Sequence, residues 1–163
     1  MREIRPSGLS RGRAPKGPSL LYRLKSLLLL VGPIQYHVGD TVQIRFEAGR
    51  DCHVYLIDAG TSGGLFLLYP NGYHADSAVT GGREYVVPAS GDPYTIPVGG
   101  PKGWEGLKIV ATLKPLDLGV KPGGAATQID FDQRSAFARR LGDELRRLKP
   151  EEWTVGTWAF RVK

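Results

Sequence analysis

The segment TVQIRFEAGRDCHVYLID, residues 41–58, decides the fold class of this chain. In residues 41–48, apolar side chains alternate with polar ones, which is the period of a strand that is buried on one face only. Residues 52–58, which follow a short turn, form a mostly apolar run that is rich in β-forming residues. The segment therefore predicts two strands that pair with each other as a hairpin.

Segments of the same character recur along the rest of the chain. The further strands that we expect are residues 64–70, 83–88, 94–98, 106–116 and 153–162. Glycine and proline, of which the chain has 22 and 12, separate these segments and supply the turns between them. Short strands with frequent turns are typical of an antiparallel β-sandwich.

Residues 132–149 interrupt the β pattern and predict one amphipathic helix. Its apolar side chains recur at spacings of four, four and three residues along one stripe: Phe137, Leu141, Leu145 and Leu148. Proline cannot continue a helix, so Pro150 marks its end. The sequence thus predicts a mainly β fold with one C-terminal amphipathic helix that is followed by a final strand.

The net charge of +6 belongs to the N-terminal part of the chain. Residues 1–25 contain seven basic residues and one acidic residue, so residues 26–163 contain 15 of each and are neutral. Residues 1–19 combine proline, glycine, serine and like charges with little to bury. This composition predicts a disordered basic arm before a single domain at 20–163. The Leu-rich residues 20–31 fit either a strand or a short helix.

The basic arm could bind nucleic acid through its charge. The cations that would make these contacts are Arg2, Arg5, Arg11, Arg13 and Lys16. The arm has no interleaved aromatic residues for stacking on bases, and a solvated tail explains its composition more simply. Nucleic-acid binding through the arm is therefore the alternative functional hypothesis.

Cys52 is the only cysteine, so the chain cannot form an intramolecular disulfide. This, with the lack of a long apolar segment that would suit a signal peptide or a transmembrane helix, predicts a cytoplasmic location. Neighbours on a strand point to opposite faces, so Cys52 and His53 cannot form a thiol–imidazole pair with each other. We expect a buried, inert cysteine, and a hydrolase that uses Cys52 would need an accessible thiol.

The segment YPNGYHADSAVTGG, residues 69–82, contains three polar candidates for a ligand or cation loop, Asn71, His74 and Asp76. Its carboxylates are too few for a calcium loop, and the histidines and the cysteine of the chain show no recognised metal spacing. Turn chemistry explains the segment more simply, because Asn-Gly forms a turn and the closing glycines open the next strand. We expect Tyr69 to be a core ring with a bonded hydroxyl group.

The segment GGPKGWEG, residues 99–106, predicts a loop with Trp104 among glycines. One interpretation is that the Trp104 ring is exposed for recognition of a partner. The other is that the ring folds back as a lid on the sandwich, and the sequence supports both equally.

Five motifs occur in order along the middle of the chain. They are YHVGD (36–40), DCHVYLID (51–58), LLYPN (67–71), GGREYVVP (81–88) and GPKGWEGLKIVAT (100–112). Together they resemble a bacterial domain family of unknown function, which is usually one module beside serine/threonine kinase, caspase-like peptidase or repeat modules. The resemblance implies an immunoglobulin-like β-sandwich with an accessory or recognition role, and it carries over no catalytic residue.

The expected function is a non-catalytic protein-interaction or accessory recognition module of a bacterial signalling or effector system. Its partner-binding residues would be Tyr69, Asn71, His74 and Trp104. We expect a protein partner, and no enzymatic activity, cofactor, metal site or membrane span.

Overall fold

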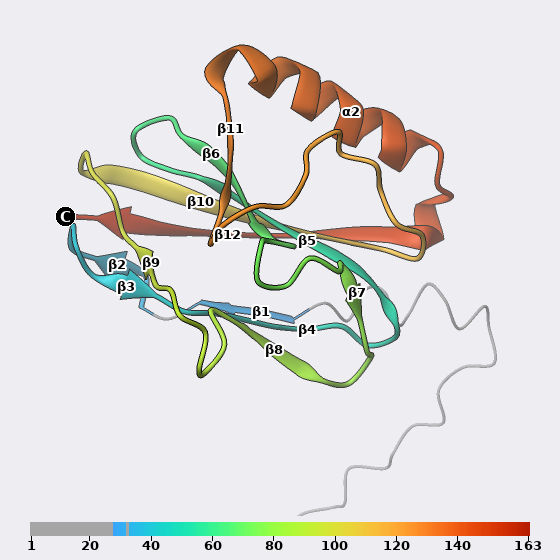
Figure 1. Ribbon diagram of the computed structural model, residues 1–163, viewed down its shortest axis with the longest axis horizontal. Coiled ribbons are helices and arrows are strands. Elements are labelled where there is room, and N and C mark those ends of the chain that lie inside the picture. Colours follow the sequence, from blue (N-terminus) through green and yellow to red (C-terminus); the bar gives the residue numbers. More distant parts are fainter. Residues whose placement is uncertain (1–27, 32) are drawn as a thin grey trace, which may run out of the picture.

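The computed structural model describes residues 28–31 and 33–163 (Figure 1). The predicted basic arm lies outside these residues. Of the segment 20–31, for which the sequence leaves strand and helix open, the described part is strand β1 (Leu28–Val31).

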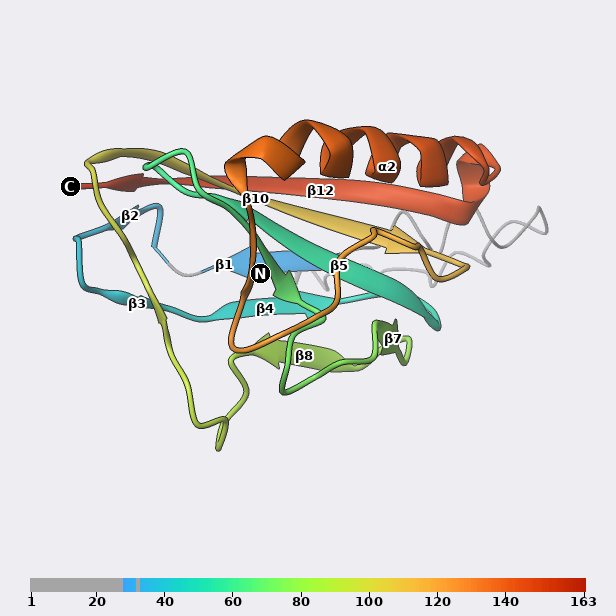
Figure 2. The ribbon, with the colours of Figure 1, turned by 45° about the horizontal axis from the view of Figure 1, so that its top comes forward.

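Two sheets form the body of the domain (Figures 1 and 2). The smaller sheet has the order β1, β4 (Ile44–Glu47) and β8 (Glu84–Val87). The seven-stranded sheet has the order β11 (Thr127–Ile129), β6 (Leu65–Tyr69), β5 (Cys52–Ala59), β10 (Gly103–Thr112), β12 (Trp153–Val162) and β2 (Gln35–Tyr36), and β7 (Ala78–Val79) pairs with β5. Strands β3 (Thr41–Val42) and β9 (Ile96–Pro97) form a separate pair.

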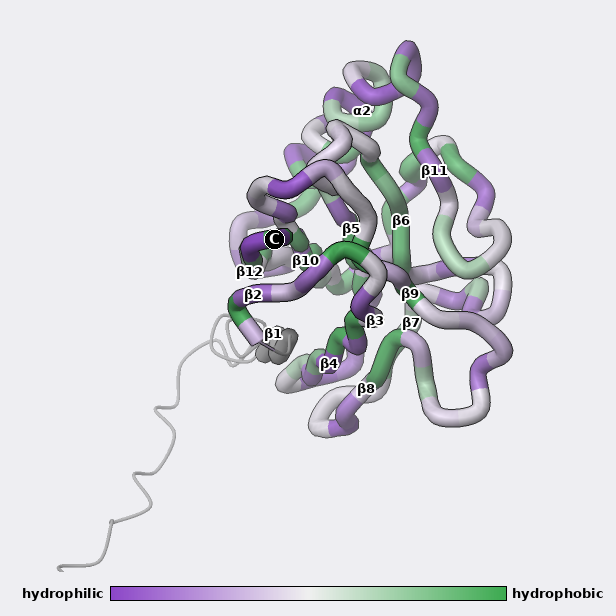
Figure 3. Tube along the Cα trace, turned by 90° about the vertical axis from the view of Figure 1, so that its left-hand side faces the viewer, coloured by the Kyte–Doolittle hydropathy of each residue, from purple (hydrophilic) through white to green (hydrophobic). Residues whose placement is uncertain are grey.

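The main core lies between the two sheets. Ile44 and Phe46 of β4 face it, as the alternation of residues 41–48 predicts, and both are almost completely buried. Leu56 of β5 and Phe160 of β12 pack into the same core from the larger sheet. Figure 3 shows apolar residues along β6 and β8, one strand from each of the two sheets.

The predicted hairpin of residues 41–48 with 52–58 is wrong. Strand β4 pairs with β1 and β8, whereas β5 pairs with β6, β7 and β10 in the other sheet. Both strands carry an apolar face, and stacking the two faces on each other buries both in one core. The turn between them therefore carries the chain from one sheet to the other.

The outer face of the larger sheet carries a second core, which helix α2 (Arg134–Arg146) covers (Figure 2). Phe137 of α2 is buried, and Leu141 packs beside it against Tyr55, Ile57 and other residues of this cluster. Strand β5 is thus buried on both faces, which explains why its sequence is a continuous apolar run.

The helix is shorter than predicted. Single 3₁₀ turns, η1 (Phe131–Gln133) and η2 (Pro150–Glu152), flank it, and η2 leads directly into β12. The mainly β fold, the antiparallel sheets and the C-terminal helix before a final strand are confirmed.

The N-terminal strands connect the two sheets at one side of the domain. Strand β1 pairs antiparallel with β4 in the smaller sheet, and β2 pairs parallel with the C-terminal end of β12 in the larger sheet. This arrangement places the C-terminal end of β12 between β10 and β2, and α2 does not extend over that end (Figures 1 and 2).

Candidate functional site

Asn71 lies two residues after the end of β6 and is completely buried. Its Nδ2 donates hydrogen bonds to the carbonyl oxygen of Leu68 at 3.0 Å and to the hydroxyl oxygen of Tyr94 at 2.9 Å. Its Oδ1 accepts hydrogen bonds from the backbone N–H groups of Tyr73 and His74, both at 2.9 Å. Asn71 therefore holds the loop together from inside, and it presents no side-chain atom to a partner.

His74 is engaged in a contact within the same loop region. Its Nε2 lies 3.0 Å from both carboxylate oxygens of Asp92, which also accepts the N–H of Ala89 at 2.7 Å. Burial raises the pKa of Asp92, but the hydrogen bonds from His74 and Ala89 outweigh it and hold that pKa below its ordinary value. The pair connects the loop after β6 to the loop after β8.

Tyr69 lies in the main core. It is 5% exposed, and its ring meets the Phe46 ring edge to face with 5.5 Å between the centroids. Burial raises the pKa of Tyr69 to about 12. Of the four predicted partner-binding residues, Tyr69 and Asn71 thus serve the interior, and His74 is paired within the loops.

Trp104 lies in strand β10 and not in a loop, because residues 103–112 pair with β12 over their full length. The next residue in the strand, Glu105, faces the main core, so the Trp104 ring points to the outer face of the larger sheet. The Trp104 side chain is 69% exposed. It does not fold back as a lid, and the interpretation of an exposed ring is the one that the structure shows.

The surroundings of Trp104 come from two strands that are far apart in sequence. Arg161 of β12 lies directly opposite Trp104 in the ladder. A hollow of about 440 Å³ adjoins the ring, and its lining includes Lys102, Arg161 and Lys163. We define the Trp104 face as the exposed side chains of Lys102, Trp104, Lys108, Arg161 and Lys163.

Comparison with known proteins assigns the middle part of the chain to a family. Residues 35–115 match the profile of a family described as Domain of unknown function (DUF4384). The chain belongs to this family. No curated protein and no solved structure matches the chain. The DUF4384 segment extends from β2 through β10 and contains Trp104, whereas α2 and β12, with Arg161, lie outside it.

The DUF4384 domain also buries two carboxyl groups that the sequence analysis missed, those of Asp58 and Glu105. They are 8% and 9% exposed and lie on the adjacent strands β5 and β10. Within the described residues Asp58 Oδ1 has no hydrogen-bond partner, and Glu105 accepts a bond from the backbone of Thr61. Burial raises the pKa of both groups, and the charge of Glu105 helps to raise that of Asp58 to about 7.

The sequence contains a signal for one member of this pair, Asp58. Asp58 continues the alternation of Val54 and Leu56, which places its carboxyl group on the core face of the strand. A carboxylate in the apolar phase of a strand indicates a buried acid, even when its partner on another strand cannot be identified.

Cys52 is buried in the main core of the DUF4384 domain, as the sequence predicts. Burial raises the pKa of its thiol to about 11, so the reactive thiolate is scarce at neutral pH. We expect an aromatic disulfide reagent to label Cys52 only when the protein unfolds, at the rate of unfolding. Fast labelling of the folded protein would contradict this and restore the hydrolase hypothesis.

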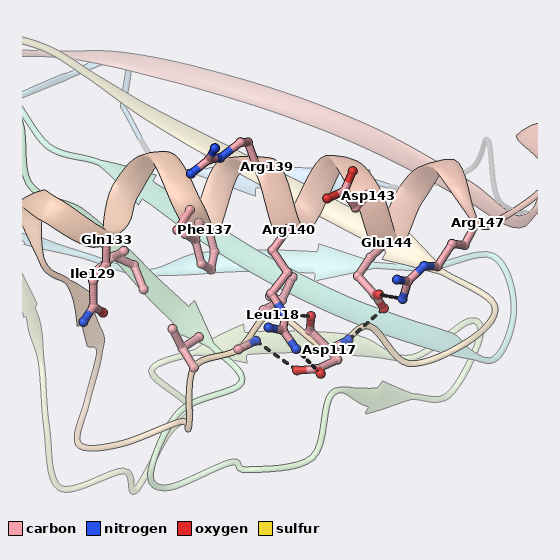
Figure 4. A pocket seen from close by; sticks show the side chains of 13 residues that line it. Asp117, Leu118, Ile129, Gln133, Phe137, Arg139, Arg140, Asp143, Glu144 and Arg147 are labelled. Carbon is pink, nitrogen blue, oxygen red and sulfur yellow. Dashed lines mark hydrogen bonds and ion pairs between the residues drawn. The ribbon is translucent and has the colours of Figure 1, made fainter.

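A groove lies between α2 and the segment that follows β10 (Figure 4). It has a volume of about 800 Å³, and its lining includes Arg140 and Glu144 of α2, Arg147 just after the helix, and Asp117. Arg140 pairs with Asp117, Arg147 pairs with Glu144, and the N–H of Asp117 donates to Glu144 at 3.0 Å. These charges neutralise one another and fix α2 to the segment below it, which is a structural role.

Other features add no site within residues 28–31 and 33–163. No three His, Cys, Asp or Glu side chains gather there to hold a metal ion. No helix in that part of the chain is long and apolar enough to cross a membrane. The arm cations Arg2, Arg5, Arg11, Arg13 and Lys16 lie outside it, so nucleic-acid binding through the arm stays a prediction.

Proposed function

We propose that this chain is a non-catalytic protein-interaction module that binds its partner through the Trp104 face. The exposure of Trp104 carries the proposal. Tryptophan is among the residues most enriched at binding hot spots, because its large rigid ring gains much from burial at little cost in conformational entropy. The other two tryptophans, Trp153 and Trp158, are half-buried, so Trp104 is the tryptophan with the most surface left to bury.

The architecture supports a recognition role. The two sheets are mostly antiparallel and pack over one core, and the first strands are divided between them. These features agree with an immunoglobulin-like sandwich. We propose that the sandwich serves as a rigid support for the Trp104 face. An accessory place in a bacterial signalling or effector system rests on the family resemblance, and a cytoplasmic location rests on the sequence prediction.

Replacing Trp104 with alanine should reduce partner retention in affinity capture by about tenfold or more, since the variant removes the proposed anchor. Phe131, which is 83% exposed and lies next to α2, provides a matched control, because Phe131→Ala removes an exposed ring from outside the Trp104 face. The measurement compares retained proteins for wild type, Trp104→Ala and Phe131→Ala by quantitative mass spectrometry.

The expected outcome is a protein that Trp104→Ala loses and Phe131→Ala keeps, with thermal unfolding unchanged for both variants. Equal retention by wild type and Trp104→Ala would exclude the Trp104 face as the binding surface. If nuclease treatment abolishes retention and Trp104→Ala does not change it, the result would favour the alternative hypothesis that the arm binds nucleic acid.

A further inference from the structure

We infer that the partner segment bound at the Trp104 face is acidic and carries an apolar or aromatic side chain near its centre. This inference rests on the proposed function and adds the chemistry of the partner to it.

Three cations of the Trp104 face form no ion pair within the part of the chain that the structure describes. Lys102, Lys108 and Arg161 are exposed, and none of them pairs with a carboxylate of residues 28–31 or 33–163. Arg140 and Arg146 of α2 differ, since each of them pairs with an acidic residue. Residues 26–163 are neutral overall, so this positive surface is a local concentration of charge and not a consequence of the composition.

Beside Trp104 the sheet has a flat floor of small residues. Gly106 lies two positions along the same face, and the ladders place Ala59 of β5 and Ala159 of β12 on either side of it. Ala59 and Ala159 are exposed, and no atom lies within 4 Å of where a Cβ of Gly106 would be. An apolar or aromatic side chain can therefore lie on this floor with its edge against the Trp104 ring.

The cations flank this floor at both ends. Lys102 and Arg161 adjoin Trp104, and Lys108 lies four residues further along β10, roughly 13 Å away for an extended strand. A peptide in extended conformation spans that distance with about four residues. Acidic side chains on both sides of a central apolar residue would thus meet the cations while the apolar residue covers the floor.

A protein segment fits this surface better than a nucleic acid. Single-stranded nucleic acids bind along a continuous positive groove with several aromatic rings for successive bases. The Trp104 face offers one ring, and its floor of small residues suits one side chain. Charge complementarity of this kind sets the choice of partner and the rate of association more than the final affinity.

The test measures binding of the full chain to a fluorescein-labelled peptide, EDEDFEDEDE, by fluorescence anisotropy. We expect Trp104→Ala and Lys108→Glu each to raise Kd by about fivefold or more, because one removes the anchor and the other reverses a flanking charge. The matched control is Lys121→Glu, which makes the same change in net charge at an exposed lysine outside the face and should alter Kd less than about twofold. The arm is present in every variant, so any binding of the peptide to the arm adds the same background to each measurement.

Two further measurements sharpen the result. Replacing the phenylalanine of the peptide by serine should weaken binding, and raising salt from about 50 to about 500 mM should weaken it by about tenfold. Peptide binding that Trp104→Ala and Lys108→Glu leave unchanged would overturn the inference. The inference would also be overturned if a single-stranded thymidine oligonucleotide bound more tightly than the peptide and if Trp104→Ala weakened that binding.

The two proposals fail in different ways. If capture of a protein partner depends on Trp104 but is unaffected by Lys108→Glu and by excess acidic peptide, the partner is not acidic and the proposed function stands. If capture does not depend on Trp104 either, both proposals fall.

Discussion

Replacing Asn71 by alanine should lower the free energy of unfolding by about 3–5 kcal/mol, the largest loss that we expect from a single side chain of this domain. The truncation removes the acceptor for the backbone N–H groups of Tyr73 and His74 and the donor to Leu68 and Tyr94. Because Asn71 is completely buried, water cannot replace these partners without opening the loop. Urea unfolding followed by circular dichroism measures the change.

The control for Asn71→Ala is Tyr94→Phe, which removes one of the same hydrogen bonds and retains the ring. Its expected cost is about 1 kcal/mol. The Tyr94 ring stacks on Tyr73 with 4.8 Å between the centroids, and phenylalanine keeps that contact. An Asn71→Ala variant with an unchanged unfolding midpoint would show that the loop hydrogen bonds contribute little to stability.

The buried carboxyl group of Asp58 should make the domain less stable as the pH rises. Its pKa is about 7 in the folded protein against an ordinary value of 3.8, so the folded state holds the proton more tightly than the unfolded state does. The stabilisation is fully present below about pH 4 and is lost as the pH rises through about 7. Glu105, whose pKa burial also raises, acts in the same direction.

Asp58→Asn should remove most of this pH dependence. A difference of about three pKa units corresponds to up to about 4 kcal/mol between the two ends of the range, reduced by any relaxation around the charged group. The readout is the slope of the unfolding free energy between about pH 5 and 8, because the cost of placing an amide there does not change with pH. Asp132→Asn, at an exposed position, provides the control. An unchanged slope for Asp58→Asn would mean that Asp58 is ionised throughout this range in the folded domain.

The local pattern of the sequence predicts the elements better than their partners. The alternation of Ile44 and Phe46 identifies a strand with one buried face, and the stripe of Phe137 and Leu141 identifies the helix that packs on the sheet. Strand pairing is harder to predict, because the hairpin rule considers only strands that are neighbours in the chain. Strand β4 instead stacks over β5, a choice that depends on the apolar faces of the whole sandwich.

In the candidate site too, the sequence singles out individual residues, whereas the fold determines their neighbours. The sequence indicates that Trp104 among glycines is unusual, but it cannot show that Arg161, 57 positions later, lies directly opposite it. That neighbour depends on the register of β10 with β12, which the complete fold sets. Asn71 is also visible as a turn residue, while the burial that makes it structural depends on the distant Tyr94 and Ala125.

The pairing of β10 with β12 has a consequence for how the domain forms during synthesis. Strand β12 provides Phe160 and Val162, both fully buried, and occupies one whole edge of β10, yet it is made after the DUF4384 segment has ended at residue 115. While the ribosome is still translating the α2 region, β10 exposes an unpaired edge, and the core lacks the side chains of Phe160 and Val162. The unit that folds is thus longer than the unit that the family profile recognises, and the nascent chain depends on its distal segment to close the sandwich.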